Sequence, residues 1–144
     1  MFIGEYHHNL DDKGRVAVPT KFRDDLVKGM IITKGLDSCL SLYTQDGWDK
    51  LLAEKLSALD FTKANDRAFQ RFMLASAMDC QLDKQGRVIL SEALRRHAKI
   101  EKKVVLVGLL KRVEIWDEAA WENYSAETDK TSNEIAEAID SPII

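Results

Sequence analysis

Short stretches in which hydrophobic and polar residues alternate occur twice in the chain, each directly after a turn that contains glycine. In the first, Val16 and Val18 fall on one side of a predicted strand and Arg15 falls on the other. Residues 87–90 repeat this alternation. A strand precedes each turn, and glycine supplies the positive φ that a tight hairpin needs. The pattern therefore predicts two hairpins, with leading strands at residues 6–10 and 79–82 and turns at 12–14 and 84–86.

Each hairpin is followed by a short helix and two further strands. Pro19 suits the first turn of one helix, and Ser91 can cap the other. Apolar and β-branched runs predict the later strands at residues 30–34, 39–43, 104–107 and 113–116. The same order of elements therefore occurs in both halves of the chain.

The two halves are copies of one unit. Residues 10–18 match residues 82–90 at an offset of 72, with five of nine positions identical. After a slip of one residue, the match continues through the later strands and ends with Trp48 on Trp121. We therefore expect an α+β fold with these parts: a β-rich unit at 5–47, a helical connection at 48–76, a second β-rich unit at 77–120, and an acidic C-terminal tail at 121–144.

The helical connection carries apolar residues at helical spacing. One stripe lies within residues 48–59, and a second includes Phe69 and Phe72. An aromatic binding face is one interpretation, but stripes of this kind are typical of core. Beyond Tyr124 the chain is polar and acidic, and we expect either a loose helix or a mobile tail there.

The composition, with 45% hydrophobic and 31% charged residues, is that of an ordinary globular protein. No apolar run approaches the ~18–20 residues needed to cross a bilayer. The N-terminus also lacks the features of a secretory signal, so we expect a cytoplasmic protein that does not bind a membrane. Cys39 and Cys80 form no close pair and are expected to be reduced.

Charge is divided unevenly along the chain, although the net charge is only −3. Residues 113–144 hold nine acids and one lysine, a net charge of −8, which leaves +5 on residues 1–112. Residues 82–103 alone carry +4. Because a polyanion responds to the local field, the negative total does not argue against a nucleic-acid partner.

Candidate chemistry lies at the turns, where the motif Asp-x-x-x-Arg occurs as Asp11/Arg15 and Asp83/Arg87. The two residues of each pair flank a glycine turn, so they lie near each other. One interpretation is a surface ion pair worth ~0–1 kcal/mol. The other is an aspartate that orients a guanidinium group toward guanine edges or phosphates. Its occurrence in both copies favours the functional interpretation.

Further basic residues accompany these pairs on the turns and the following helices. A cationic turn beside a helix start suits a ribbon inserted in a DNA groove, with neighbouring side chains on phosphates. A merely solvated charged surface is the alternative. The candidate DNA-binding residues are Lys13, Arg15, Lys21, Arg23, Lys84, Arg87 and Arg95, with Asp11 and Asp83 as orienting carboxylates.

These motifs resemble those of the MraZ family of bacterial transcriptional regulators. The resemblance rests on the paired Leu-Asp-x-x-Gly-Arg-Val, on residues 18–23, on residues 107–109 and on Glu114-Ile115-Trp116-Asp117, and it weakens after Tyr124. It implies two SpoVT/AbrB-like units of the double-ψ or swapped-hairpin type in a pseudo-twofold arrangement. It also implies a closed homo-oligomeric ring, an octamer, that binds double-stranded DNA at short direct repeats in the promoter of the cell division and cell wall gene cluster.

The resemblance assigns DNA reading to the two Asp-x-x-x-Arg segments and places the protein at the nucleoid. The second copy departs from the family pattern at Gln85, which replaces a basic residue, and at Ser91, which replaces proline. We therefore expect the first copy to be the stronger reader.

Other classes of protein stay open. An AbrB-type antitoxin would use the same fold to bind a protein, with residues 127–144 wrapping the partner, although such antitoxins usually carry one copy of the unit. A purely structural ring would not need the arginines. No phosphate-binding glycine loop or nucleophile elbow suggests an enzyme. His7 and His8 point to opposite faces of a strand, so we predict no metal site. We also predict no cofactor and no catalytic residue.

Overall fold

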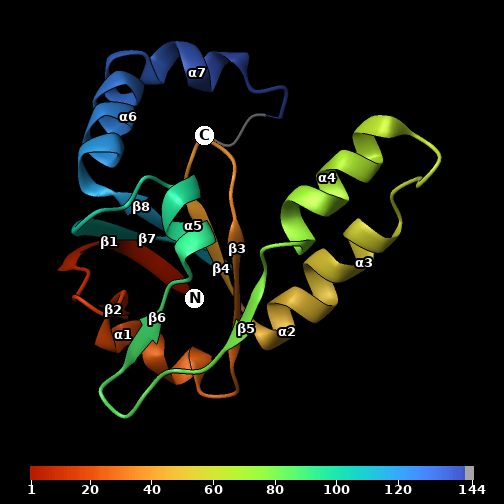
Figure 1. Ribbon diagram of the computed structural model, residues 1–144. Helices are drawn as coiled ribbons and strands as arrows, with labels where there is room; N and C mark the ends of the chain where they lie inside the picture. The colour runs from red at the N-terminus through yellow and green to blue at the C-terminus, as the bar shows by residue number, and fades with distance from the viewer. Residues whose placement is uncertain (142–144) are drawn as a thin grey trace.

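The computed structural model describes residues 1–141, which form a large antiparallel sheet, a small two-stranded ribbon and surrounding helices (Figure 1). The strands are β1 (Phe2–Asn9), β2 (Arg15–Ala17), β3 (Met30–Lys34), β4 (Leu40–Thr44), β5 (Met78–Cys80), β6 (Arg87–Ile89), β7 (Lys103–Leu110) and β8 (Arg112–Asp117). The helices are α1 (Thr20–Arg23), η1 (Asp24–Leu26), α2 (Gln45–Gly47), η2 (Trp48–Leu52), α3 (Ala53–Ser57), α4 (Ala64–Leu74), α5 (Glu92–His97), α6 (Glu118–Lys130) and α7 (Ser132–Ala138).

The strands of the two units are exchanged. Six of them form one sheet in the order β1-β7-β8-β4-β3-β5, and β2 pairs with β6 in the ribbon. Strand β1 of the first unit thus pairs with β7 of the second, while β5 of the second unit pairs with β3 of the first. The order reads the same from either end when equivalent strands are interchanged. This confirms the predicted pseudo-twofold arrangement of two β-rich units.

The predicted hairpins form only at their turns. The Asp11 N–H donates to the Arg15 carbonyl over 2.9 Å, and the Asp83 N–H donates to the Arg87 carbonyl over 2.9 Å. Beyond the turns, the expectation of two self-paired hairpins is wrong, because β1 pairs with β7 and β2 pairs with β6. Alternation identifies a strand and its buried face, but both copies offer a partner with the same pattern.

The strand register also corrects the alignment of β3 with β7, whereas β4 and β8 keep the predicted offset of 73. His8 lies opposite Val104, and its equivalent 72 residues later, Cys80, lies opposite Met30. Strands β3 and β7 are therefore related by 74 residues, although the sequence match suggested 73. The second unit thus has two extra residues between its short helix and β7.

The two sheets and the short helices enclose one main core. Phe22 of α1 is 2% exposed and contacts Phe2 and Tyr6 edge to face, with ring centroids 5.1 Å and 5.2 Å apart. Leu94 holds the matching position on α5 and is fully buried. As predicted, Ser91 caps α5, because its side-chain oxygen accepts from the Leu94 N–H. Burial of one such side chain contributes ~1.5–3 kcal/mol.

The helical connection projects beside the sheet as two packed segments, α2–α3 and α4 (Figure 1). Its packing agrees only in part with the predicted core stripes. Leu56 and Met73 are buried, but Leu51 and Phe69 are each 38% exposed. Phe61, in the loop between the segments, is 74% exposed. The expectation that the whole stripe belongs to the core is therefore wrong.

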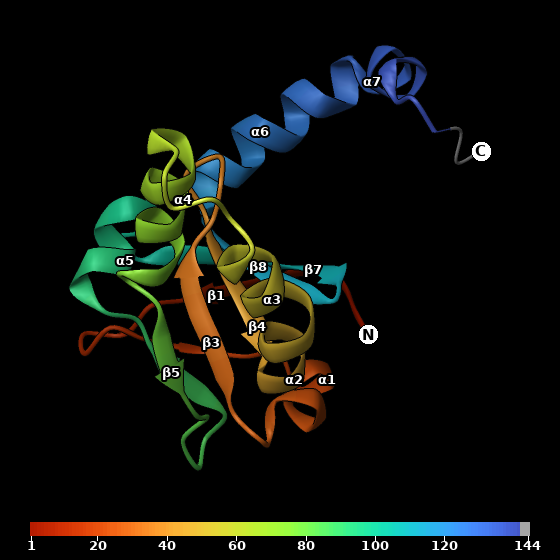
Figure 2. The same cartoon turned by 90° about the vertical axis from the view of Figure 1, so that its right-hand side faces the viewer.

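The C-terminal region forms an arm of two helices, α6 and α7, that extends away from the sheets (Figure 2). Only its base is packed: Trp116 of β8 contacts Trp121 and Tyr124, with ring centroids 5.3 Å and 5.1 Å apart. Residues 131–141 are all exposed. Of the two expected states of the tail, the structure has the helix, and residues 142–144 of the predicted tail lie outside the described residues.

A histidine on the edge strand ties the arm to the sheet. The two ring nitrogens of His7 lie 3.0 Å from Glu118, the first residue of α6, and 2.9 Å from Glu5. Hydrogen bonds to these carboxylates raise the pKa of His7 above its ordinary value.

Within residues 1–141, no helix is both long and apolar enough to span a membrane.

Candidate nucleic-acid interface

The ribbon of β2 and β6 presents one buried face and one outward face. Val16 and Val88 lie opposite each other and are 0% and 2% exposed, so their side chains belong to the core. The outward positions alternate with them: Arg15 lies opposite Ile89, and Ala17 lies opposite Arg87. Two arginines from different units therefore share one short surface, and neither unit builds that surface alone.

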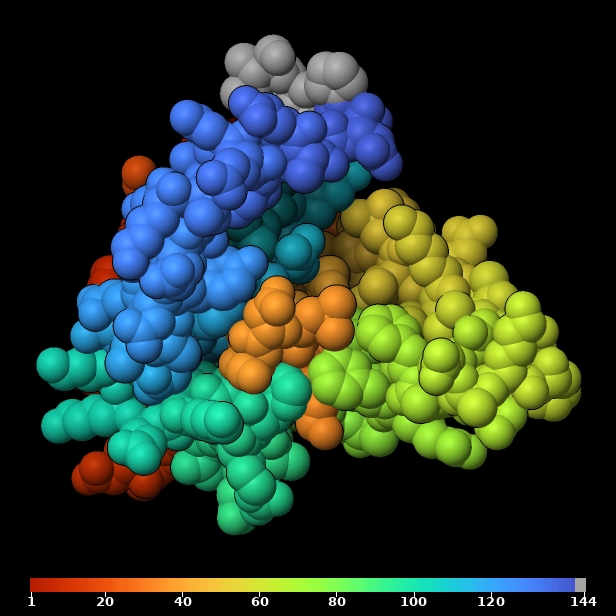
Figure 3. Space-filling model, turned by 90° about the horizontal axis from the view of Figure 1, so that it is seen from above, coloured from red at the N-terminus to blue at the C-terminus, as the bar shows by residue number. Residues whose placement is uncertain are grey.

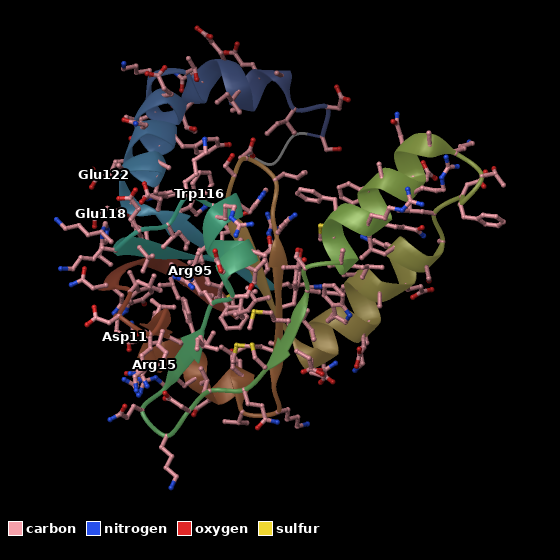
Figure 4. The ribbon with its side chains drawn as sticks, in the orientation of Figure 1. Asp11, Arg15, Arg95, Trp116, Glu118 and Glu122 are labelled. Carbon is pink, nitrogen blue, oxygen red and sulfur yellow. The ribbon has the colours of Figure 1, made fainter. Side chains whose placement is uncertain are left out.

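Each arginine is held by the aspartate on the other side of its own turn. The Asp11 carboxylate accepts from the backbone N–H groups of Lys13 and Arg15, both over 2.9 Å, and from Arg15 Nε over 2.7 Å. Asp83 makes the same three bonds with Gln85 and Arg87, each over 2.9 Å. Figure 4 shows Asp11 and Arg15 close together beside the ribbon. The aspartates thus fix both the turn and the side chain that follows it.

These bonds also fix the charge state of the site. The Arg15 backbone N–H is the largest cause that lowers the pKa of Asp11, and the Arg15 side chain and the Lys13 N–H act in the same direction. The pKa of Asp83 is lowered in the same way, first by the Arg87 backbone N–H. Both carboxylates are therefore ionised at neutral pH, and each guanidinium group keeps its partner.

The two pairs approach each other across the ribbon. Arg87 Nη1 lies 3.7 Å from the Asp11 carboxylate, in addition to its own bond with Asp83. The four side chains are between 28% and 38% exposed, so they are partly packed but reachable from solvent. Nε of each arginine donates to its own aspartate, and within residues 1–141 no hydrogen bond engages the terminal nitrogens, which can therefore donate to a planar acceptor.

Arg23 and Arg95 have a structural role that the sequence did not indicate. Arg23 Nε donates to the Val18 carbonyl over 2.9 Å, and Arg95 Nε donates to the Leu90 carbonyl over 3.1 Å. The Arg23 guanidinium group lies directly against Gly86 of the other unit. In the symmetric contact, Arg95 lies against Gly14. Each arginine therefore braces the turn of the opposite unit.

Both turn glycines are needed for conformation as well as for space. Gly14 has φ +81° and Gly86 has φ +75°, in the region that side-chain-bearing residues rarely adopt. The Gly14 carbonyl accepts from the Leu90 N–H over 2.8 Å, and the Gly86 carbonyl accepts from the Val18 N–H over 2.9 Å. Lys13, Lys21 and Lys84 are exposed around this framework. The structure thus brings the two aspartates and the four arginines together at the ribbon and its turns, and it places Lys21 on α1.

The described part of the chain has neither a cluster of metal-binding side chains nor a disulfide. Residues 1–141 contain no group of three His, Cys, Asp or Glu side chains that could hold a metal ion. Cys39 and Cys80 are both free. Burial raises the pKa of Cys39 to about 12 and that of Cys80 to about 11, so both are protonated thiols.

The fold and the ribbon define a two-repeat protein of the swapped-hairpin class, in which strand exchange builds a paired Asp–Arg surface. The family model described as "MraZ protein, putative antitoxin-like" matches residues 1–72 and 73–141. A protein named "Transcriptional regulator MraZ" from Caldanaerobacter subterraneus subsp. tengcongensis is 50% identical over 141 residues, 98% of each chain. A protein of the same name from Pediococcus pentosaceus is 50% identical over 137 residues, 95% of each chain. The chain belongs to the MraZ family.

Membership of this family confirms two predictions. It bears out the resemblance on which the two-unit fold was expected. It also bears out the prediction of a non-enzymatic protein, since the relatives are named as transcriptional regulators.

Proposed function

We propose that the protein is a sequence-specific transcriptional regulator that binds double-stranded DNA. The observation that carries the proposal is the doubled Asp–Arg pair on the outward face of the ribbon, where Arg15 and Arg87 are each held by a carboxylate yet partly exposed. The names of the relatives support the same function.

The chemistry of the ribbon suits the major groove. That groove is ~12 Å wide and admits a two-stranded β-ribbon. Terminal nitrogens of an arginine fork match the O6 and N7 acceptors of guanine, and here the fork is oriented beforehand through Nε. Lys13, Lys21 and Lys84 then bind phosphates, and Arg23 and Arg95 reach phosphate with their terminal nitrogens while they brace the turns. Because Gln85 replaces a basic residue, the first unit is the stronger reader.

We also propose assembly into a closed homo-oligomeric ring, an octamer, that engages several short direct repeats at once. One protomer offers few cationic contacts, so repeated engagement has to supply the affinity. Exposed apolar surface supports assembly: Leu36, Phe69 and Phe72 line a groove on α4, and Ile135 and Ile139 of the arm are 45% and 46% exposed. Family membership supports a cytoplasmic, nucleoid-associated protein that acts at the promoter of the cell division and cell wall gene cluster.

The experiment that tests DNA binding is a mobility-shift titration on the DNA upstream of the protein's own gene. We expect Arg15→Ala and Arg87→Ala each to weaken specific binding by about 10- to 100-fold, which is what one guanine interaction contributes. Arg15→Lys keeps the charge but removes the fork, and should fail in the same assay. Arg71→Ala, exposed on α4, is the matched control. Unchanged binding by both ribbon variants would refute the proposal.

An antitoxin-like module is the second candidate. The description of the family model includes that word, and the exposed acidic arm is the feature of this chain that favours it. The two candidates differ in what purifies with the protein. A small protein partner in constant ratio, displaced by deletion of residues 131–144, would favour the antitoxin. A homo-oligomer without such a partner favours the regulator.

A further inference from the structure

The two ends of the ribbon are built alike but flanked differently. At the first end, the turn at residues 11–15 lies beside residues 95–103, because the Leu10 N–H donates to the Lys102 carbonyl over 2.6 Å. At the second end, the turn at residues 83–87 lies beside residues 23–29, which share a groove with it. Pseudo-twofold symmetry relates these two ends, so their side chains can be compared directly.

The comparison shows a difference in charge. The short helix and the segment after it, residues 92–103, hold five basic side chains and two acidic ones, whereas the equivalent residues 20–29 hold three basic and two acidic ones. With the turns, of which residues 11–15 are neutral and residues 83–87 carry +1, the first end carries +3 and the second end +2. The difference is concentrated after the helix, because residues 99–103 hold three lysines and residues 27–29 hold Lys28 alone.

The extra charge is exposed and close to the reading surface. We call Arg96, Lys99, Lys102 and Lys103 the basic shoulder; all four are exposed. Arg96 pairs with Glu92 over 2.9 Å, while the three lysines make no ion pair with any residue in 1–141. In Figure 3 the teal side chains of this segment project from the surface next to red atoms of the first unit.

The backbone at the shoulder adds a second observation. Lys99 follows α5 with φ +55°, a left-handed conformation that favours glycine. In the first unit, the equivalent Val27 has φ −62°, and Gly29 supplies the positive φ instead, at +110°. The two units thus end their short helices differently, and the second places a lysine side chain at the left-handed position.

We propose that the basic shoulder binds the phosphate backbone beside the groove that the ribbon enters, and thereby gives each protomer one orientation on DNA. The inference rests on the proposed function. By itself the ribbon is nearly symmetric, because Arg15 and Arg87 exchange places under the pseudo-twofold rotation. Phosphate contacts set register and orientation without reading sequence. Three unpaired lysines lie within residues 99–103, whereas the equivalent residues 27–29 hold Lys28 alone, and this difference makes the two orientations unequal.

Salt dependence tests whether the shoulder contacts phosphate. The variant Lys99→Ala/Lys102→Ala/Lys103→Ala should bind the same DNA with its sequence preference intact. The slope of log K against log salt should become shallower by about 0.9 for each phosphate that the variant no longer neutralises, so by up to about 2.7 for each protomer bound to DNA. The matched control, Lys50→Ala/Lys55→Ala/Lys63→Ala on the helical connection, removes the same charge and should keep the slope. An unchanged slope in the shoulder variant overturns the proposal.

Orientation is measured with a tethered DNA-cleaving reagent. Iron-EDTA is attached at Glu101→Cys near the shoulder or at Val27→Cys at the other end, since Cys39 and Cys80 are buried or partly buried. We expect the two positions to cut opposite flanks of each bound repeat, and the shoulder variant to lose this preference. If the protein with its shoulder lysines intact cuts both flanks equally from either attachment position, the inference is refuted.

Other outcomes separate this inference from the proposed function. If the shoulder variant changes oligomer mass but not the salt slope, the shoulder binds the acidic arm of a second copy, and the proposal fails. If Arg15→Ala and Arg87→Ala leave specific binding intact, the proposed function fails first. If those variants lose specific binding and the shoulder variant behaves as wild type, only the inference about orientation is wrong.

Discussion

The two turn glycines sit at equivalent positions, yet the structure predicts different costs for replacing them with alanine. At both, a residue with a side chain has to adopt a positive φ, which costs ~1–2 kcal/mol. At Gly14 an added Cβ would lie 3.4 Å from the Arg95 guanidinium carbon, an ordinary contact. At Gly86 an added Cβ would overlap the Arg23 guanidinium group. Arg23 would have to move.

The size of the difference follows from the hydrogen bond that Arg23 would give up. Its Nε bond to the Val18 carbonyl, 2.9 Å long, cannot persist if the group moves, and such a bond contributes ~0.5–1.5 kcal/mol. We therefore expect Gly86→Ala to lower the free energy of unfolding by about 2–3 kcal/mol. Gly14→Ala should lower it by about 1–2 kcal/mol, from the backbone alone.

Urea denaturation followed by tryptophan fluorescence measures both losses of stability. Protein concentration has to be equal in all samples, because assembly links stability to concentration. The double variant Gly86→Ala/Arg23→Ala isolates the clash: its loss of stability should be smaller than the sum of the two single losses, since Arg23 is then already absent. Equal losses at Gly14 and Gly86, or strict additivity in the double variant, would refute the reasoning.

Two further outcomes test the core and the arm. Phe22→Ala should lower the free energy of unfolding by about 3–5 kcal/mol, because it empties a fully packed site among Phe2 and Tyr6; a loss below ~1 kcal/mol in urea denaturation would contradict the packing. His7 should titrate by NMR with a midpoint above 6.5, and Glu118→Gln should move that midpoint back down. Since the folded pKa is raised, this bond adds stability that is fully present below pH ~6.5 and is lost as pH rises through the folded pKa. A wild-type midpoint at or below 6.5 would argue against the contact.

The sequence was sufficient for the parts of the fold that local pattern determines. Val16 and Val88 face inward and Arg15 and Arg87 face outward as the alternation predicts, and Ser91 caps its helix. The motif also identified the aspartate partners, because a turn of fixed length brings residues four apart together. These features depend on neighbours in the chain, so the chain itself is enough to predict them.

The features that could not be predicted from the sequence depend on contacts between the two copies or on how the rest of the fold covers a helix. Nothing in residues 15–17 says whether their partner is their own leading strand or residues 87–89, because repetition makes the hydrophobic faces equivalent. The contact of Arg23 with Gly86 could not be predicted for the same reason, since it joins two residues of different units that are 63 positions apart in the sequence. The exposure of Phe69 could not be predicted from spacing, which shows that a helix has an apolar face but not that the fold covers it.

Strand exchange also bears on how such a protein could have arisen. A polypeptide with one unit could build this ribbon only by joining a second, identical molecule, and any change in its turn would then appear at both ends. Fusion of two units into one polypeptide removes that constraint. Asp12 and its counterpart Lys84 already carry opposite charges, as do Asp24 and Arg96. Covalent linkage thus allows the two ends of the ribbon, which an identical pair of molecules would keep equal, to become different.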